Sequence, residues 1–225
     1  SSGGDDAAAD LVAVEDQQGS FNTRCEYSHT AHDDPIVHAG HAGMSHLHEF
    51  FGATTTDADA TVDSLLAGDT TCQTRADRSA DWAPAVLVDG EPVHPTHVVV
   101  YYRVPLGADA DAVEVPPNGL EMIAGDHHAA APQDPDEVHW ACGPRGEPEP
   151  EPPPCWVGVE PVLRLHFDPC WDGENLASAD HRSHLAKLGA DGSCPDSHPV
   201  LLPQLRLEFR YPVDGAFAEG ELSLA

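Results

Sequence analysis

The chain has 225 residues, of which 40% are hydrophobic, enough for a core, and no apolar run approaches the length of a membrane span. It carries 39 acidic and 10 basic side chains, for a formal net charge of −29 at pH 7. Such a surface repels phosphate backbones and anionic lipids, so we exclude nucleic acid and membrane as partners. We interpret the acidic excess as a solubilising shell on a monomer, with cation binding at carboxylate clusters as the alternative.

In chain order, residues 1–20 are small, acidic and poor in aromatics, which predicts a disordered leader. This start lacks the features of a signal peptide and is typical of a mature end from which one has been removed. Further along, alternation of apolar and polar residues, with β-branched or aromatic side chains, predicts strands. An apolar stretch that begins at Thr61 and ends at Gly68 predicts a short helix. The strands are expected at 21–27, 45–51, 82–88, 96–104, 120–124, 163–167 and 204–211, and helical turns at 61–67 and 179–188.

The strand at 96–104 is the strongest, and its apolar run predicts burial on both faces. The strand at 204–211 alternates apolar with charged residues, which predicts one face on the core and one face in solvent. Residues 146–154 are only Gly, Glu and Pro, which favours an extended polyproline-like loop. We therefore expect a single all-β domain over residues 21–225, an antiparallel β-sandwich-like fold with long loops and little helix.

Six cysteines are present, with no CxxC pair, so a zinc ribbon or thioredoxin-like motif is disfavoured. An even number at wide spacing predicts three disulfides and a secreted, extracellular protein. Six cysteines allow fifteen pairings, and buried free thiols are the alternative. We favour pairing between sequence neighbours, namely Cys25–Cys72, Cys142–Cys155 and Cys170–Cys194.

Fifteen histidines form clusters that suggest a metal site. His46 and His48 are two apart on an expected strand, so their rings point the same way. His181 and His184 are three apart, which one helical turn brings to one face. Together with His198 they are our candidate ligands for one transition metal ion, zinc or copper, because neutral imidazole suits both. The alternative for each histidine is a structural hydrogen bond to the backbone.

Two carboxylates are the candidate catalytic groups. Asp180 and Glu49 lie beside the histidines and would serve as general base or as partners that orient a metal-bound ring. A carboxylate pair acting on a glycosidic bond is a weaker possibility, because 39 acidic residues make chance proximity common. Whether the protein is an enzyme stays open at this point.

Several motifs are similar to one known family. They are SHLHEFFG at 45–52, CWDGENL at 170–176, DHRSHLA at 180–186 and CPDSHPV at 194–200. On these motifs the chain closely resembles a secreted fungal and actinobacterial family catalogued only as a domain of unknown function, number nineteen-ninety-six. The resemblance covers roughly residues 21–215.

The resemblance implies a polysaccharide- or cell-wall-directed role by association and carries no assigned activity. Members of this kind continue past the last strand into a further His-x-Asp segment, which this chain lacks before Ala225. If that histidine completes the site, the site here is incomplete. Our leading hypothesis is thus a cell-wall glycan protein with a histidine-rich metal pocket. The alternatives are a non-catalytic carbohydrate-binding module and a structural extracellular surface protein.

Overall fold

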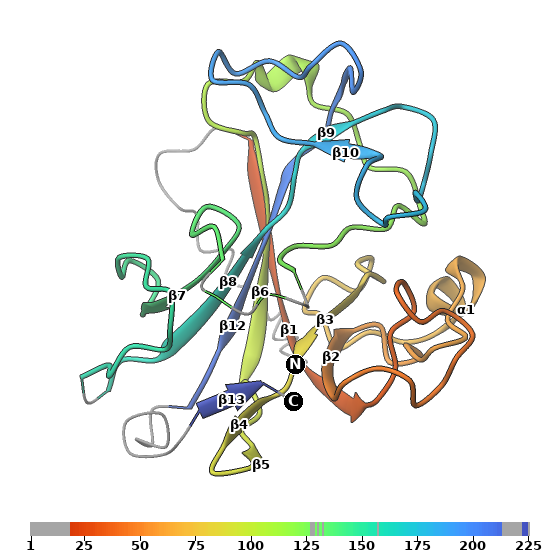
Figure 1. Ribbon diagram of the computed structural model, residues 1–225. Coiled ribbons are helices and arrows are strands. Elements are labelled where there is room, and N and C mark those ends of the chain that lie inside the picture. The colour runs from red at the N-terminus through yellow and green to blue at the C-terminus, as the bar shows by residue number, and fades with distance from the viewer. Residues whose placement is uncertain are drawn as a thin grey trace, which may run out of the picture.

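The computed structural model describes residues 19–126, 129, 131, 133–156, 158–212 and 222–224. Its strands lie in one large central sheet with two small sheets beside it (Figure 1). The strands are β1 (Ser20–Ala31), β2 (His48–Gly52), β3 (Ala80–Pro84), β4 (Val86–Val88), β5 (Glu91–Pro92), β6 (His97–Arg103), β7 (Val138–Cys142), β8 (Pro161–His166), β9 (Cys170–Trp171), β10 (Leu185–Ala186), β11 (Val200–Leu201), β12 (Gln204–Arg210) and β13 (Leu222–Leu224). The helices are α1 (Val62–Ala67) and the 3-10 turn η1 (Ala110–Ala112).

The central sheet has seven strands in the order β3-β2-β1-β6-β12-β8-β7, and every neighbouring pair is antiparallel. The small sheets are β10-β9-β11 and β13-β4-β5. The predicted antiparallel, mainly β fold with little helix is therefore confirmed. Its main layer is a single curled sheet, and the smaller sheets and long loops pack around it.

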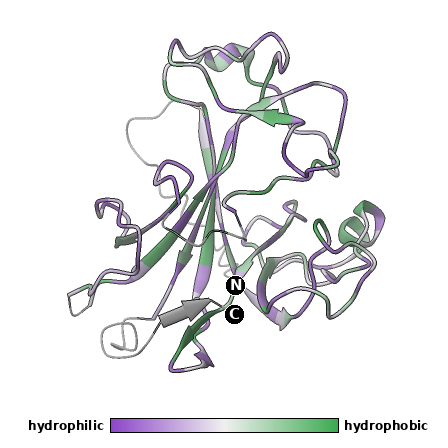
Figure 2. Ribbon diagram, in the orientation of Figure 1, coloured by the Kyte–Doolittle hydropathy of each residue, from purple (hydrophilic) through white to green (hydrophobic). Residues whose placement is uncertain are grey.

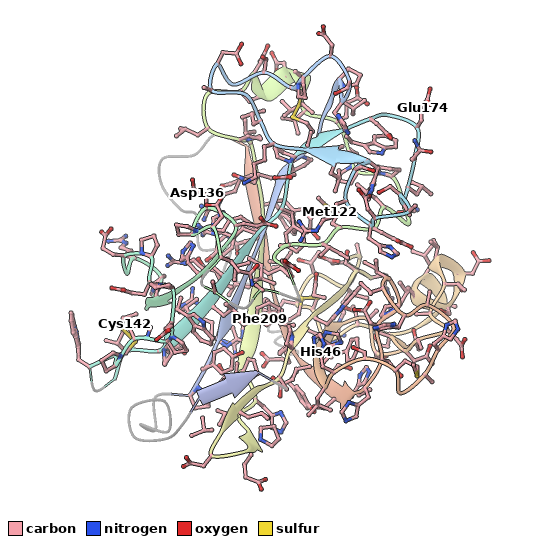
Figure 3. All side chains as sticks on the ribbon, in the orientation of Figure 1. His46, Met122, Asp136, Cys142, Glu174 and Phe209 are labelled. Carbon is pink, nitrogen blue, oxygen red and sulfur yellow. A yellow bond between two sulfur atoms is a disulfide. The ribbon has the colours of Figure 1, made fainter. Side chains whose placement is uncertain are left out.

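The core lies on one face of this sheet. Strand alternation points Leu205, Leu207 and Phe209 of β12 to the same side as Val98 and Val100 of β6. The central strands carry hydrophobic residues, whereas the peripheral connections are largely hydrophilic (Figure 2). Met122 lies beside the sheet and Phe209 within it (Figure 3). A continuous apolar face therefore runs across the middle of the sheet.

The opposite face of the sheet differs from the prediction. Arg206, Glu208 and Arg210 alternate with the core residues of β12, as expected, but Glu208 is 0% exposed. The arginine side chains on β12 are only 17% and 12% exposed. The prediction of a solvent-facing charged side was wrong here, because the arginines lie over the carboxylate between them and form ion pairs with it.

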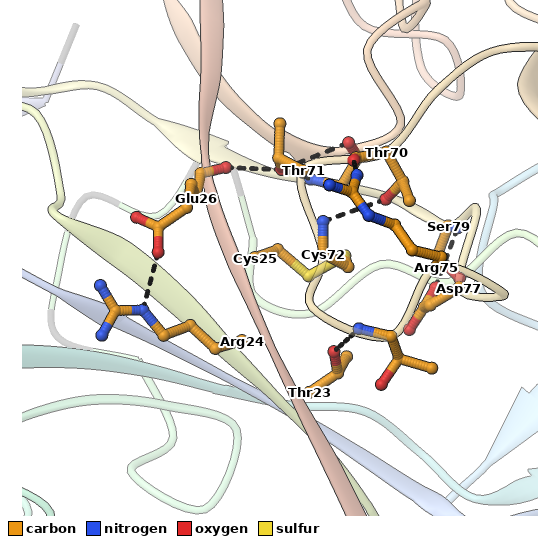
Figure 4. The surroundings of a disulfide bond; sticks show 12 residues. Thr23, Arg24, Cys25, Glu26, Thr70, Thr71, Cys72, Arg75, Asp77 and Ser79 are labelled. Carbon is orange, nitrogen blue, oxygen red and sulfur yellow. Dashed lines mark hydrogen bonds and ion pairs between the residues drawn. A yellow bond between two sulfur atoms is a disulfide. The ribbon is translucent and has the colours of Figure 1, made fainter. Parts of the chain in front are cut away.

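All three predicted disulfides are confirmed: Cys25–Cys72, Cys142–Cys155 and Cys170–Cys194. The first is fully buried and joins β1 to the segment before β3 (Figure 4). Around it, the Thr71 hydroxyl donates to the Glu26 carbonyl at 2.7 Å. The second closes the Glu/Pro loop, in which Glu149 makes an isolated bridge to Trp140.

The helix prediction at 61–67 is confirmed by α1, whose Thr61 side chain accepts from the Ser64 amide at the N-terminus. The helix prediction at 179–188 was wrong. The Asp180 carboxylate accepts the amides of Arg182 and Ser183, at 3.1 and 2.9 Å, and His181 has a φ of 58°. This local turn competes with helix formation, as short acidic side chains commonly do.

The strand prediction at 120–124 was also wrong. This segment makes no strand pairing among the described residues, although Glu121 donates its amide to the Leu176 carbonyl at 2.9 Å. Met122 and Ala124 instead pack against the core as an extended cover over the sheet. The predicted leader lies almost wholly outside the described residues, which begin at Gly19. No described helix has the length and apolar character to cross a membrane.

Candidate functional site

A cleft of about 1280 Å³ opens on the core side of the sheet. Its floor is formed by apolar residues of the central strands, including Leu163, Leu165 and Leu205. One wall is the extended cover, residues 115–126. The other wall is formed by residues 34–38 and 76–82 together with α1. The cleft thus lies where the long loops between strands meet the sheet, which is where binding sites are commonly built.

The lining combines apolar and polar surfaces. Val62, Leu66 and Val115 line the cleft and are 37%, 51% and 89% exposed, respectively. Trp82 also lines it and packs against the buried Phe50, with ring centroids 6.0 Å apart and an interplanar angle of 32°. The polar lining includes Asp34, His38, Ser45, His46, His48, Asp77, Arg78, Asp81, Asn118 and Glu121. A ligand with apolar faces and polar edges fits such a lining.

The predicted pair His46 and His48 lies in this cleft. Strand β2 begins only at His48, so His46 stands in the loop before it, yet the two rings are 4.3 Å apart. The Nδ1–H of His48 donates to the Asp33 carbonyl at 2.8 Å. Burial lowers the pKa of His48 to about 4, because the neighbouring His46 acts in the same direction and the hydrogen bond to Asp33 offsets only part of the decrease. His48 is therefore neutral at physiological pH.

Asp81 is a cleft residue that the sequence prediction missed, because the expected strand began one residue later. It is 6% exposed, and its Oδ2 has no hydrogen-bond partner in the described part of the chain. Burial raises the pKa of Asp81 to about 8, and the charge of Asp77 adds to the rise. Asp77 in turn accepts a hydrogen bond from the Tyr102 hydroxyl at 3.1 Å. At neutral pH the cleft thus holds a protonated carboxyl group.

Strand β3 explains why Asp81 and Trp82 both line the cleft although they point to opposite faces of the sheet. It is the edge strand next to β2, and Phe51 pairs with Asp81 and Phe50 with Trp82. The cleft passes this edge and so meets side chains from both faces. The sequence signal for this pair of cleft residues was Asp81 directly before Trp82, at the start of the strand expected over 82–88.

Two histidines of the second predicted group, His184 and His198, have structural hydrogen bonds, whereas Nδ1 of His181 is buried and lacks a partner among the described residues. Both ring nitrogens of His184 are engaged, Nδ1 with the Ser178 hydroxyl at 2.9 Å and Nε2 with the Glu121 carbonyl at 2.7 Å. The Ser178 hydroxyl also lies 2.7 Å from Asp180. His198 lies at the surface and contacts the Ser183 carbonyl through Nε2 at 3.0 Å. These side chains hold the loop between β9 and β10 in place.

Asp180 is exposed, and its hydrogen bonds to Ser183, Ser178 and Arg182 lower its pKa. Such a carboxylate is a poor proton acceptor. Glu49 is 1% exposed and does not line the cleft; its Oε1 contacts His94 Nδ1. Burial raises the pKa of Glu49, and His94 opposes the rise. The structure therefore does not bring together the two carboxylates predicted as catalytic groups.

Glu121 is the residue that connects the two histidine groups, and the sequence prediction missed it. Its side chain lines the cleft, and its carbonyl accepts from His184. Burial raises the pKa of Glu121, His181 and His184 lower it, and Asp34 from the opposite wall raises it. Both walls of the cleft therefore act electrostatically on this carboxyl group.

The five candidate metal ligands do not form one site. Within the described residues, no group of three or more His, Cys, Asp or Glu side chains is arranged to hold a metal ion. His184 has no free nitrogen, and His198 belongs to a surface turn. What the structure does bring together is the pair His46 and His48 with the carboxyl groups of the cleft.

The family model described as "Domain of unknown function (DUF1996)" matches residues 34–224. The match includes both walls of the cleft and six of the seven strands of the central sheet, because β1 lies wholly before it. No curated protein and no solved structure matches the chain. The chain therefore belongs to the DUF1996 family.

Proposed function

We propose that the protein is a secreted, non-catalytic carbohydrate-binding protein whose cleft holds a stretch of uncharged polysaccharide, such as a cell-wall glycan. The observation that carries the proposal is the lining of the cleft, where Trp82 and exposed aliphatic side chains face the same space as histidine and carboxyl groups. Sugar rings have apolar faces that stack on indole and hydroxyl edges that hydrogen-bond to such groups.

The size of the cleft supports a polymer as the ligand. Pockets for small molecules span roughly 300–1,000 Å³, whereas this cleft has about 1280 Å³ and extends to the edge strand β3. An open cleft of this size can hold several sugar units of a chain that continues beyond it.

The charge of the cleft supports an uncharged ligand. Asp34, Asp77 and Glu121 line it, and no lysine or arginine does so except Arg78. A polyanionic glycan would be repelled by these carboxylates at the short distances of a bound complex. The three disulfides are compatible with the oxidising compartment in which such polysaccharides occur.

The test is a pull-down on insoluble chitin, cellulose, xylan and β-1,3-glucan, followed by equilibrium binding to a soluble oligosaccharide of the retained polymer. We expect Trp82→Ala to weaken binding at least about tenfold, since a buried aromatic anchor contributes on the order of 2 kcal/mol. Trp156→Ala is the matched control, because Trp156 is 68% exposed and lies outside the cleft. Retention on none of the polymers, or equal loss in both variants, would contradict the proposal.

Asp81 favours a second candidate function, glycoside hydrolysis. A carboxyl group that is protonated at neutral pH in a cleft, with the Asp77 carboxylate acting on it, has the properties of a general acid. The test is release of reducing ends from the retained polysaccharide. Release that is abolished in Asp81→Asn, while binding persists, would establish hydrolysis; no release by the wild type leaves binding as the function.

A further inference from the structure

The sheet face opposite the cleft concentrates positive charge in a protein that has little of it. Besides Arg24 of β1, which pairs with Glu26, four of the chain's ten basic residues lie on this face, namely Arg103, Arg164, Arg206 and Arg210. They come from the three adjacent strands β6, β12 and β8. We call the four arginines, together with Tyr101, His139 and His166, the basic face. Its charge is opposite in sign to the net charge of −29.

Part of the basic face is a structural ion-pair network. The buried Glu208 carboxylate lies 3.2 Å from Arg164 Nε, 2.9 Å from an Nη of Arg206 and 2.6 Å from an Nη of Arg210. Arg210 also pairs with Glu160 at 3.3 Å. Arg164 is further fixed by the carbonyl of Gly143 at 3.0 Å. These contacts hold Arg164, Arg206 and Arg210 in place around Glu208.

Arg103 is left outside this network. Its guanidinium lies 4.5 Å from the centroid of the Tyr101 ring, and Arg206 lies 4.5 Å from the same centroid. No ion pair joins Arg103 to a carboxylate of the described residues, and its Nε lacks a hydrogen-bond partner there. The four guanidinium groups share only Glu208 and Glu160, which leaves two positive charges in excess.

His166 lies beside this excess charge. It pairs directly with Arg206 across the strands, and its Nε2 also lacks a partner among described residues. Burial, together with the neighbouring groups Arg206, His139, Arg164 and Arg103, lowers the pKa of His166 to about 4. Three neighbouring side chains, Arg103, Arg206 and His166, thus each carry a nitrogen atom without a hydrogen-bond partner among the described residues, and Arg206 shares its one counter-anion, Glu208, with two other arginines.

We propose that Arg103, Arg206 and His166 form a binding site for a sulfate or phosphate group on the sheet face opposite the cleft. Planar guanidinium groups donate pairs of hydrogen bonds to such tetrahedral anions, and an imidazole N–H adds a further donor. The anion would neutralise the excess charge that Glu208 and Glu160 leave. It arrives either as the free inorganic ion or as an ester on a sugar, and both sources present the same oxygens.

The experiment is calorimetric titration of the intact protein with inorganic sulfate, inorganic phosphate and a sulfated disaccharide, at matched ionic strength in chloride. Saturable binding is expected, and Arg103→Gln should weaken it roughly tenfold, as loss of a charge-assisted hydrogen bond does. Arg103 is preferred as the variant because it contributes nothing to the Glu208 network. Arg145→Gln, which removes an exposed arginine elsewhere, should bind as the wild type does.

A second readout is the His166 imidazole followed by NMR across a pH titration. A bound anion favours the protonated ring, so sulfate should raise the pKa of His166 more than chloride does, and Arg103→Gln should abolish that difference. Tighter binding of the disaccharide than of inorganic sulfate identifies an ester as the ligand, and equal binding identifies the free ion. Absence of saturable binding by all three anions, or unchanged binding in Arg103→Gln, overturns the proposal. Trp82→Ala should leave anion binding intact, which separates this site from the cleft.

Discussion

Single buried ionisable groups decide much of the chemistry of this protein, and Asp81 is the clearest case. Its pKa rises from an ordinary 3.8 to about 8 in the folded chain. The folded state therefore holds a proton that the unfolded state releases between these pH values, and stability falls as pH rises through that window. The free energy of unfolding of Asp81→Asn should therefore increase relative to that of the wild type as the pH rises, by up to roughly 1.4 kcal/mol per pH unit.

Chemical denaturation of both proteins between pH 4 and pH 8 measures this difference directly. Taking the difference between the two proteins removes the opposing contributions of His48 and His166, whose lowered pKa values destabilise the fold in acid. A stability difference that does not change with pH would show that Asp81 is ionised in the fold.

Glu208 is the second decisive residue, because three arginines pair with its buried carboxylate. Glu208→Gln leaves Arg164 and Arg206 without a counter-anion and Arg210 with Glu160, and it should cost roughly 3–5 kcal/mol in the free energy of unfolding. Glu26→Gln is the matched control, since its pair with Arg24 is 52% and 44% exposed and should matter by less than about 0.5 kcal/mol. Similar losses in urea denaturation of the two variants would contradict the network.

At the scale of elements, the sequence predicted strands whose pattern depends on local alternation. β6, β8 and β12 lie where the β-branched and alternating runs predicted them, and α1 follows its threonine cap. The errors arose where a side chain or a distant segment overrides local preference. Asp180 captures two backbone amides and prevents a helix, and residues 120–124 cover the sheet without joining it.

The candidate site could be predicted only in part for the same reason. His46 and His48 are brought together by neighbouring positions in the chain, so their proximity was visible in the sequence. Asp81 and Glu121 enter the cleft from segments that meet only through the tertiary fold. The burial of Glu208 was equally hidden, because it depends on arginines from two strands packing over one carboxylate.

The disulfide between Cys25 and Cys72 joins strand β1 to the segment before β3. It closes a separation of 47 residues within the core, whereas Cys142–Cys155 closes 13 residues around a surface loop. Loop entropy predicts a loss of about 4 kcal/mol for the first pair and about 3 kcal/mol for the second. Replacement of each pair by alanine should therefore lower the melting temperature more for Cys25/Cys72, with lost core packing adding to the difference. An equal or smaller decrease would contradict this assignment.

For the whole molecule, the net charge of −29 sets the response to salt. Mutual repulsion of the acidic shell opposes the compact state, and salt screens it. The melting temperature should therefore rise between low ionic strength and about 1 M sodium chloride, where the screening length is roughly 3 Å. Differential scanning calorimetry measures this, and a melting temperature that falls with salt would show that specific surface ion pairs outweigh the repulsion.

The central claim is that the cleft between the sheet and residues 115–126 binds polysaccharide. Hydrogen–deuterium exchange, with and without a saturating soluble oligosaccharide of the retained polymer, tests it most directly. We predict slower exchange in residues 115–126 and 76–82, which form the two walls, with little change around Trp156 or on the basic face. Slower exchange confined to those distant segments, with the cleft walls unchanged, would contradict the account.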